Sequence, residues 1–453
     1  MNYLSTMFVL SVLCGFFPMT VNALAPPADD QRLYQIIDAV SAQRIEQDIR
    51  TLAGFGTRNT LSDTTSQTRG IGAARRWIKA EFERISNDCG DCLEVGFQSA
   101  WVKSGENKRI PEDTEIVNVI AIQRGTRYPN RYVIMSGDID SRASDVNDAE
   151  IDAPGANDNA TGMAGTLEAA RVLSAYEFPV SIAYVGLSGE EQGLFGGKFL
   201  AEKARSEGWE IIGVLNNDMI GNIEGIDGVI DNRSFRIFSE PTPVTETEEE
   251  RKMRRYTGGE VDGISRQLAR YVHRLTRHYL PQLNPMMIYR LDRFGRGGHH
   301  RPFNDVGFSA IRIMEAHENY NRQHQDIRVE DDIHYGDVIE GVNFDYAARL
   351  TAVNAISLAG LAWAPPAPTE VKIGGAVMPS TTLAWHGSDD SDLAGYRIYW
   401  RDTTAPQWQH SRFVGKVNEF TLHNIVIDNY LFGVAAVAVN GHESVVSFPS
   451  GRL

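Results

Sequence analysis

The chain has 453 residues, a formal net charge of −15 and an apolar content of 42%. That length suits more than one domain, and the apolar fraction is ordinary for a globular protein. The acidic balance argues against nucleic acid as a partner.

The amino-terminal stretch is apolar. Leu4 to Val21 has few polar interruptions, and Val21-Asn22-Ala23 supplies a small-x-small cleavage pattern. This pattern resembles a secretory signal peptide over residues 1–23, with an uncleaved anchor as the alternative because no Lys or Arg precedes the apolar run. No later stretch is long and apolar enough to span a bilayer. We therefore expect a periplasmic or secreted protein with no integral membrane segment after removal of the signal.

Two cysteines remain once the signal is removed. They are Cys89 and Cys92, in a C-x-x-C pattern with no second pair elsewhere. Such a pair could be a redox centre or half of a zinc site. In an exported protein, a small structural disulfide is the preferred interpretation.

Residues 32–52 and 70–85 have apolar side chains at helical spacing. Beyond them, apolar stretches rich in β-branched and aromatic residues alternate with further helical patterns. The predicted strands span residues 94–101, 116–123, 131–136, 180–187, 211–215 and 307–314, and the later helices span residues 163–175, 264–280 and 342–362. Residues 222–262 are polar and predict an insertion. The alternation predicts an α/β fold with a mainly parallel central sheet and helices on both faces.

The pattern changes after a proline cluster at residues 364–368, which predicts a linker between a first domain of residues 24–363 and a second of residues 369–453. Short strands separated by turn residues predict a β-sandwich in the second domain. Trp385 and the Tyr396-Arg397-Ile398-Tyr399-Trp400 pattern resemble a fibronectin type III module. The resemblance implies a docking or spacing module that binds a surface or polymer.

Acidic residues lie at or just after the carboxyl ends of the predicted strands. They are Asp138 and Asp140, Asp158, Glu190 and Glu191, and Asp218. A bare pair of glutamates is usually a solvated loop. The carboxyl ends of parallel strands, however, meet at one edge of a sheet, where ligands bind. So many like charges need a multivalent cation, for which carboxylates and imidazoles are suitable ligands. The candidate imidazoles are His299, His300, His317 and His324.

Four ordered motifs resemble those of the co-catalytic dizinc exopeptidases, which include bacterial leucyl aminopeptidases and plasma glutamate carboxypeptidase. They are Gly137-Asp138-Ile139-Asp140-Ser141, Pro154-Gly155-Ala156-Asn157-Asp158-Asn159, Ser188-Gly189-Glu190-Glu191-Gln192-Gly193 and Asn217-Asp218-Met219. The resemblance covers about residues 32–362 and implies two zinc ions and a peptide substrate.

The resemblance also implies a role for each residue. Asp158 would bridge the two ions, with a cis peptide bond to Asn159 in support. Glu191 and Asp218 would each bind one ion, and His324 would be the late histidine ligand. Glu190 would be the general base, taking a proton from an activated water and passing it to the leaving amine.

The sequence departs from the family at Asp138, where a histidine is usual. The aspartate two residues later normally orients that histidine through its ring N–H, so the supporting role of Asp140 is in doubt. If Asp138 is a ligand, one ion has only oxygen ligands, from Asp138, Asp158 and Asp218. Such a site should hold zinc less selectively and tolerate manganese.

The preferred function is an exported aminopeptidase. Arg296, His300 and Tyr320 are candidate substrate contacts. Arg296 and His300 lie in residues 293–300, a glycine-rich segment typical of a mobile active-site wall, and Arg296 and Tyr320 are candidates for the oxyanion stabiliser. One alternative is a single-zinc glutaminyl cyclase on the same scaffold. The other is a non-catalytic binding or adhesion protein, against which the retained Glu190 argues.

Overall fold

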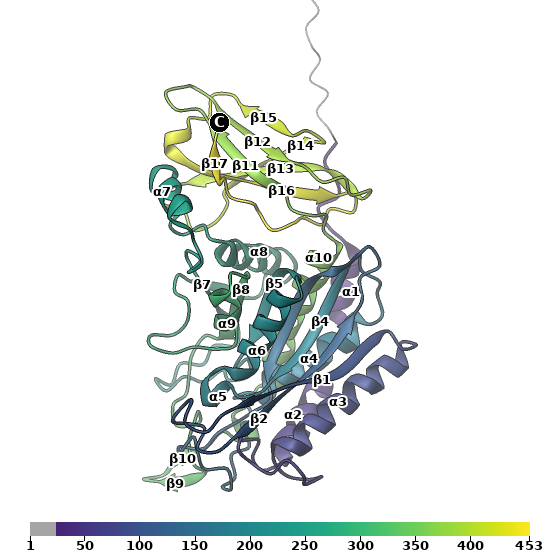
Figure 1. Cartoon of the computed structure of the whole chain (residues 1–453), viewed down its shortest axis with the longest axis vertical. Helices are drawn as coiled ribbons and strands as arrows, with labels where there is room; N and C mark the ends of the chain where they lie inside the picture. The colour runs from purple at the N-terminus through teal and green to yellow at the C-terminus, as the bar shows by residue number, and fades with distance from the viewer. Residues whose placement is uncertain (1–23) are drawn as a thin grey trace, which may run out of the picture.

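The computed structural model describes residues 24–453. The predicted signal peptide lies outside these residues. Within them, no helix has both the length and the apolar character needed to cross a bilayer. Figure 1 shows a large α/β part with a smaller pair of β-sheets at one end.

The large part is built on an eight-stranded sheet in the order β1-β2-β4-β3-β5-β8-β6-β7. Its four central strands, β4, β3, β5 and β8, are parallel, whereas β1, β2 and β6 join by antiparallel pairing. The bounds are β1 (Leu93–Val102), β2 (Thr114–Gln123), β3 (Tyr128–Asp138), β4 (Val180–Leu187), β5 (Glu210–Asn217), β6 (Ser234–Ser239), β7 (Asn284–Ile288) and β8 (Ala310–Glu315). The mainly parallel α/β fold predicted from the sequence is confirmed.

Helices cover both faces of the sheet (Figure 1). Alternate residues of β3 enter different clusters: Val133 packs with α1–α4, α8 and α10 on one face, and Ile134 packs with α6 and α9 on the other. The bounds are α1 (Gln31–Ala39), α2 (Ala42–Gly54), α3 (Gly70–Asp88), α4 (Ala160–Leu173), α6 (Phe195–Ser206), α8 (Ile264–Tyr279), α9 (His300–Asp305) and α10 (Phe344–Trp363). Such alternation is what a sheet buried on both faces requires.

Two predicted elements need correction. The single helix predicted over residues 32–52 is two helices, because Ser41 caps α2 with its side chain and donates its own N–H to Glu168. The polar insertion predicted over residues 222–262 contains β6, whose Phe235 and Ile237 are fully buried, and α7 (Glu248–Thr257). β7 was also missed, because its short run carries a proline and lies at the sheet edge.

The predicted disulfide is confirmed. Cys89 and Cys92 are bonded, with their Cα atoms 5.7 Å apart. The bond joins the end of α3 to the start of β1.

The carboxyl-terminal residues form two sheets. One is ordered β15-β12-β11-β17 and the other β14-β13-β16. Leu383 and Trp385 of one sheet share a core with Tyr396 and Phe432 of the other, as in a β-sandwich. The bounds are β11 (Thr369–Gly374), β12 (Thr381–His386), β13 (Leu393–Asp402), β14 (His410–Gly415), β15 (Glu419–Leu422), β16 (Tyr430–Ala438) and β17 (Gly451–Arg452). The fibronectin type III resemblance stays a prediction.

The two parts are joined by buried polar contacts. Asp262 accepts from Arg270 at 2.7 Å and from Arg401 of β13 at 2.8 Å, and all three side chains are at most 1% exposed. Arg127 also pairs with Asp390 across the boundary. Removing one partner of a buried ion pair is costly. The carboxyl-terminal sheets are therefore docked on the large part as well as connected to it by the residue 364–368 segment.

Candidate metal centre

The acidic residues singled out in the sequence do meet at one edge of the sheet. Asp138 ends β3, Glu190 and Glu191 follow β4 in the short helix α5 (Glu190–Gly193), and Asp218 follows β5. Asp158 immediately precedes Asn159, the capping residue of α4. This is the carboxyl edge of the parallel strands, where ligands bind in open α/β sheets.

Three of the predicted ligands converge on one point. His324 Nε2 lies 2.9 Å from Asp158 Oδ2 and 3.0 Å from Glu191 Oε1. One donor atom from each residue lies within 4.8 Å of the other two. We call Asp158, Glu191 and His324 the metal triad. Zinc binds both imidazole nitrogen and carboxylate oxygen, and catalytic zinc sites keep three protein ligands with one open position.

Charge at the metal triad fits a cation. Burial works against the charged form of His324, yet the Glu191 charge and the hydrogen bonds to Asp158 and Glu191 raise the pKa of His324 to about 10. Burial would likewise raise the pKa of Asp158, but its hydrogen bond to His324 holds that pKa below the usual range. A proton on His324 therefore offsets one of the two carboxylate charges that face it. A divalent ion would displace this proton and use the neutral imidazole as a ligand.

Buried groups fix the backbone of the Asp158 loop. Asp337 accepts from the Asp158 N–H at 2.7 Å and from the Asn157 N–H at 2.8 Å. Arg58, which is 1% exposed, donates from Nη2 to the Gly155 carbonyl at 2.9 Å. The peptide bond from Asp158 to Asn159 is cis, as predicted. The Asp158 carboxylate is therefore presented by a loop held on both sides.

Asp140 has a support role different from the one expected. Its Oδ1 accepts from the Glu190 N–H at 3.2 Å and its Oδ2 from the Glu191 N–H at 3.0 Å. Asp140 is 2% exposed. It positions the backbone of the general-base candidate and of a metal-triad residue, rather than a side chain at position 138.

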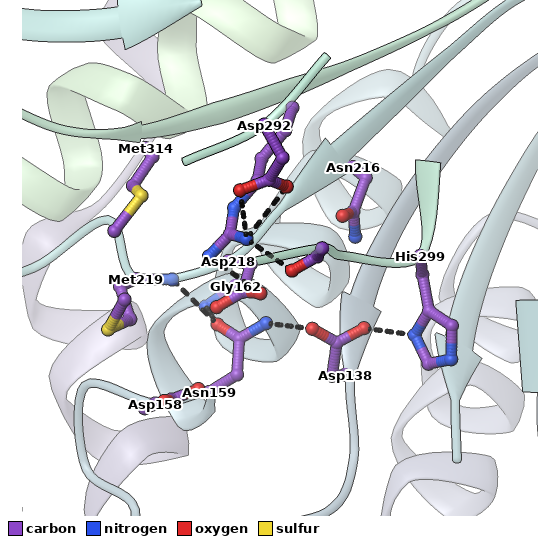
Figure 2. A network of polar contacts seen from close by, with 12 residues as sticks. Asp138, Asp158, Asn159, Gly162, Asn216, Asp218, Met219, Asp292, His299 and Met314 are labelled. Atoms are coloured by element: carbon purple, nitrogen blue, oxygen red, sulfur yellow. Dashed lines mark hydrogen bonds and ion pairs between the residues drawn. The ribbon is translucent and has the colours of Figure 1, made fainter. Parts of the chain in front are cut away.

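Both oxygens of Asp138 and one oxygen of Asp218 already have fixed partners, whereas Asp218 Oδ1 is buried without a hydrogen-bond partner. Asp138 Oδ1 lies 2.5 Å from His299 Nδ1, and Asp138 Oδ2 accepts from Asn159 Nδ2 at 2.8 Å. Figure 2 shows Asp138 between these two side chains. Arg312 of β8 places Nη2 2.8 Å from Asp218 Oδ2. We call Asp138, Asp218, His299 and Arg312 the Arg312 cluster.

The residues present fit one ion and not two. The metal triad offers three converging donors. In the Arg312 cluster both oxygens of Asp138 are engaged, and the Asp218 carboxylate faces a fully buried guanidinium. A second divalent ion there would lie beside that fixed positive charge and compete with it for Asp218. His324 and Asp218 are thus placed in different surroundings, which the motifs alone did not distinguish.

Of the three predicted substrate contacts, one is buried and two are exposed. His300 is fully buried and its Nε2 lies 2.8 Å from the Leu291 carbonyl oxygen, so assigning it to substrate contact is wrong. Arg296 and Tyr320 are exposed. Arg296 reaches the side chain of Gln323, the neighbour of His324, which leaves it at the rim of the site. His317 lies 3.9 Å from Asp231 and is not part of the metal triad.

Several functional residues were missed from the sequence. They are Arg58, Asp292, Arg312 and Asp337. One signal was available for Arg312, because a charged residue inside an otherwise apolar predicted strand must find a buried partner. The other three act through backbone contacts or across elements, and nothing in local sequence marks such contacts.

Comparison with known proteins agrees with this geometry. A model of peptidase family M28 matches residues 118–338. A probable zinc metalloprotease from Pyrenophora teres f. teres is 41% identical over 94% of this chain and 88% of its own length. Another, from Pyricularia oryzae, is 38% identical over 95% of this chain and 86% of its own length.

Two solved structures share the fold. The Legionella pneumophila LapA aminopeptidase matches with a TM-score of 0.52 and 17% identity, covering 76% of this chain and 78% of its own. The Macrostomum lignano glutaminyl cyclase matches with a TM-score of 0.52 and 14% identity, covering 75% of this chain and 94% of its own.

Proposed function

Because the chain belongs to the M28 peptidase family of zinc metalloproteases, we propose that it is an exported aminopeptidase that removes amino-terminal residues from peptides. The observation that carries the proposal is the metal triad directly beside Glu190. Glu191 is both a member of the triad and the next residue in α5.

The chemistry follows from these neighbours. A zinc ion held by Asp158, Glu191 and His324 supplies a Lewis acid that polarises a carbonyl and acidifies water. Burial raises the pKa of Glu190 well above its usual value, and the negative charges of Glu191, Asp218, Asp138 and Asp158 raise it further. A cation at the metal triad would offset this effect and favour the ionised form of Glu190, which can take a proton from the attacking water and return it to the leaving amine. Asp140 keeps Glu190 in place through its backbone.

The charge of the site supports action at the amino terminus. Five carboxylates (Asp138, Asp158, Glu190, Glu191 and Asp218) gather at the same sheet edge. Three cationic groups lie against these carboxylates: Arg312 and His324 are paired with Asp218 and Asp158, and Arg142 lies 3.9 Å from Glu191. The excess of negative charge favours a substrate ammonium over a substrate carboxylate.

Two zinc ions, with manganese tolerated at the oxygen-rich one, stay a prediction for this chain. In that arrangement Asp138 and Asp218, together with Asp158, would hold the second ion. The existing contacts of Asp138 and Asp218 are the reason that our mechanism uses the metal triad alone.

Export rests on the apolar stretch of residues 1–23. The Cys89–Cys92 disulfide supports it, since such bonds persist in oxidising compartments. Amino-terminal sequencing of protein recovered outside the cytoplasm should begin at Leu24. Docking to a surface or polymer through the carboxyl-terminal sheets is a further proposal.

A glutaminyl cyclase is the second candidate, because the residues fit one ion and a cyclase is expected to use one. Peptides with a free amino terminus and an amidated carboxyl terminus should be shortened by one residue at a time, and amino-acetylated versions should stay intact. The aminopeptidase proposal fails if only the acetylated peptides are cut. Loss of ammonia from peptides that begin with glutamine, without chain shortening, would identify a cyclase. Glu190→Gln is the matched inactive control.

A further inference from the structure

The Arg312 cluster is built as firmly as the metal triad, and by different means. Arg312 is fully buried, and its two terminal nitrogens, Nη1 and Nη2, contact different partners. At one end, Nη1 donates to the Gly297 carbonyl at 2.8 Å and lies 3.1 Å from Asp292 Oδ2. At the other end, Nη2 lies 2.8 Å from Asp218 Oδ2. The charge is therefore held at Asp218 by contacts that do not depend on any ligand.

Asp138 is held in a comparable way by His299, which is also fully buried. Two glycines leave the space that the side chains of His299 and Arg312 occupy. A Cβ on Gly197 would come within 2.7 Å of His299 Cδ2, and a Cβ on Gly298 would come within 3.1 Å of Arg312 Nη1. Close packing of this kind shows that His299 and Arg312 have defined places in the folded chain.

The metal triad lacks such a built-in cation. Its carboxylates contact His324, an imidazole that is itself a metal donor and is 23% exposed, while Arg142 Nη1 stays 3.9 Å from Glu191 Oε2, beyond hydrogen-bond distance. His324 lies on a loop with φ of +53°, an uncommon backbone conformation for a residue other than glycine. One half of the acidic edge is thus open to an ion, while the other already carries its positive charge.

We propose that Arg312 permanently takes the place of the second metal ion, so that the working enzyme holds one ion, at Asp158, Glu191 and His324. Arg312 neutralises Asp218, and His299 with Asn159 satisfies Asp138. The inference rests on the proposed metal-dependent function of the same site. It concerns how many ions are bound and where, which can be measured without turnover.

The test is the zinc content of purified full-length chain, measured by elemental mass spectrometry across a range of buffered free zinc. We expect one zinc per chain in the parent, one in Asp138→Asn and none in His324→Ala. Arg312→Gln should take up a second zinc at high free zinc, because Asp218 is released. Arg270→Gln, which also removes a buried arginine from an aspartate but far from the site, is the matched control and should keep one zinc.

Two zinc ions in the parent would overturn the proposal, as would a single zinc that is lost in Asp138→Asn and kept in His324→Ala. A folded Arg312→Gln that stays at one zinc would overturn the part assigned to Arg312. If this variant does not fold, the Asp138→Asn and His324→Ala counts still decide where the ion lies. The same counts in the Glu190→Gln background separate this proposal from the proposed function, since they need no activity.

Discussion

The metal triad and the Arg312 cluster are two halves of one acidic edge, and the negative charge of their carboxylates is balanced by different side chains. In the triad, Asp158 and Glu191 face a histidine that can give up its proton to an ion. In the cluster, Asp218 faces an arginine that keeps its charge at any working pH. Buried carboxylates need a positive partner in either case. The side chain that supplies the partner decides whether the position can bind metal.

An acidic sequence motif does not by itself identify a metal ligand. Asp158 and Asp218 belong to motifs that resemble those of two-metal enzymes, yet among the described residues only Asp158 has two further donor side chains that converge with it on one point. The difference comes from Arg312, which is distant in sequence from both. The partner of a carboxylate therefore has to be known before a metal can be assigned to it.

The largest effect should come from Glu190→Gln, which leaves both halves unchanged and removes the base. Turnover should fall by about 10²–10⁴-fold, the usual contribution of a positioned acid or base. Zinc content should not change, because Glu190 is not in the metal triad. Steady-state kinetics and elemental analysis on one preparation check both statements. A variant that keeps more than a tenth of the turnover would exclude Glu190 as the base.

Asp140→Asn should weaken zinc binding at the metal triad, because Asp140 supports the backbone of α5. Its carboxylate accepts the N–H groups of Glu190 and Glu191. An amide can satisfy only part of that arrangement, so Glu191 loses its fixed backbone. Zinc affinity should drop by about 10–100-fold, as for other supports of a ligand. Competition with a coloured chelator measures this, and an unchanged affinity would show that α5 is held by other contacts.

His299→Leu should disturb the Arg312 cluster without touching the metal triad. It removes the partner of Asp138 Oδ1 and leaves that buried oxygen unsatisfied. The cost in unfolding free energy should be about 1–3 kcal/mol. Zinc content should stay that of the parent. Denaturant titration and metal analysis report the two quantities separately, and a loss of zinc would mean that the halves are coupled.

Asp48 supplies a third case, a buried carboxylate of α2 whose charge is not neutralised. Burial raises the pKa of Asp48 to about 7. The positive charge of Arg44 lowers this pKa, and the negative charges of Glu81 and Glu168 raise it. Because the folded-state pKa is above the unfolded one, the stability that Asp48 contributes is present below pH 4 and is lost as the pH rises towards 7. Asp48→Asn avoids this loss.

The melting temperature of Asp48→Asn should therefore exceed that of the parent by a few degrees at pH 8 and by less at pH 5. Asp88→Asn, at an exposed carboxylate of α3, is the control and should show no such dependence. An equal difference at both pH values would mean that Asp48 is ionised in the folded chain throughout this range.

Much of this molecule could be predicted from local pattern. The buried strands and their carboxyl ends were visible in the sequence, and with them the meeting of Asp138, Glu191 and Asp218 at one edge. The family resemblance supplied His324, and its membership in the metal triad agrees with that assignment. These features depend on periodicity and motif order, which a single sequence contains.

Other features depend on contacts between distant elements. β6 was taken for part of an insertion, because its six residues include serine and arginine among the apolar side chains. His300 was assigned to the substrate because of its neighbours in a glycine-rich segment, whereas the fold turns it inward. The pairing of Arg312 with Asp218 joins β8 to the end of β5. Only the tertiary structure brings such partners together.

The most direct test of a single ion is an anomalous-scattering map at the zinc absorption edge, from crystals of the parent protein grown with excess zinc. We predict one peak, enclosed by Asp158, Glu191 and His324, with the Arg312 guanidinium still at Asp218. A second peak about 3.5–4 Å from the first, the usual spacing of a two-metal site, between Asp138 and Asp218, would contradict the account.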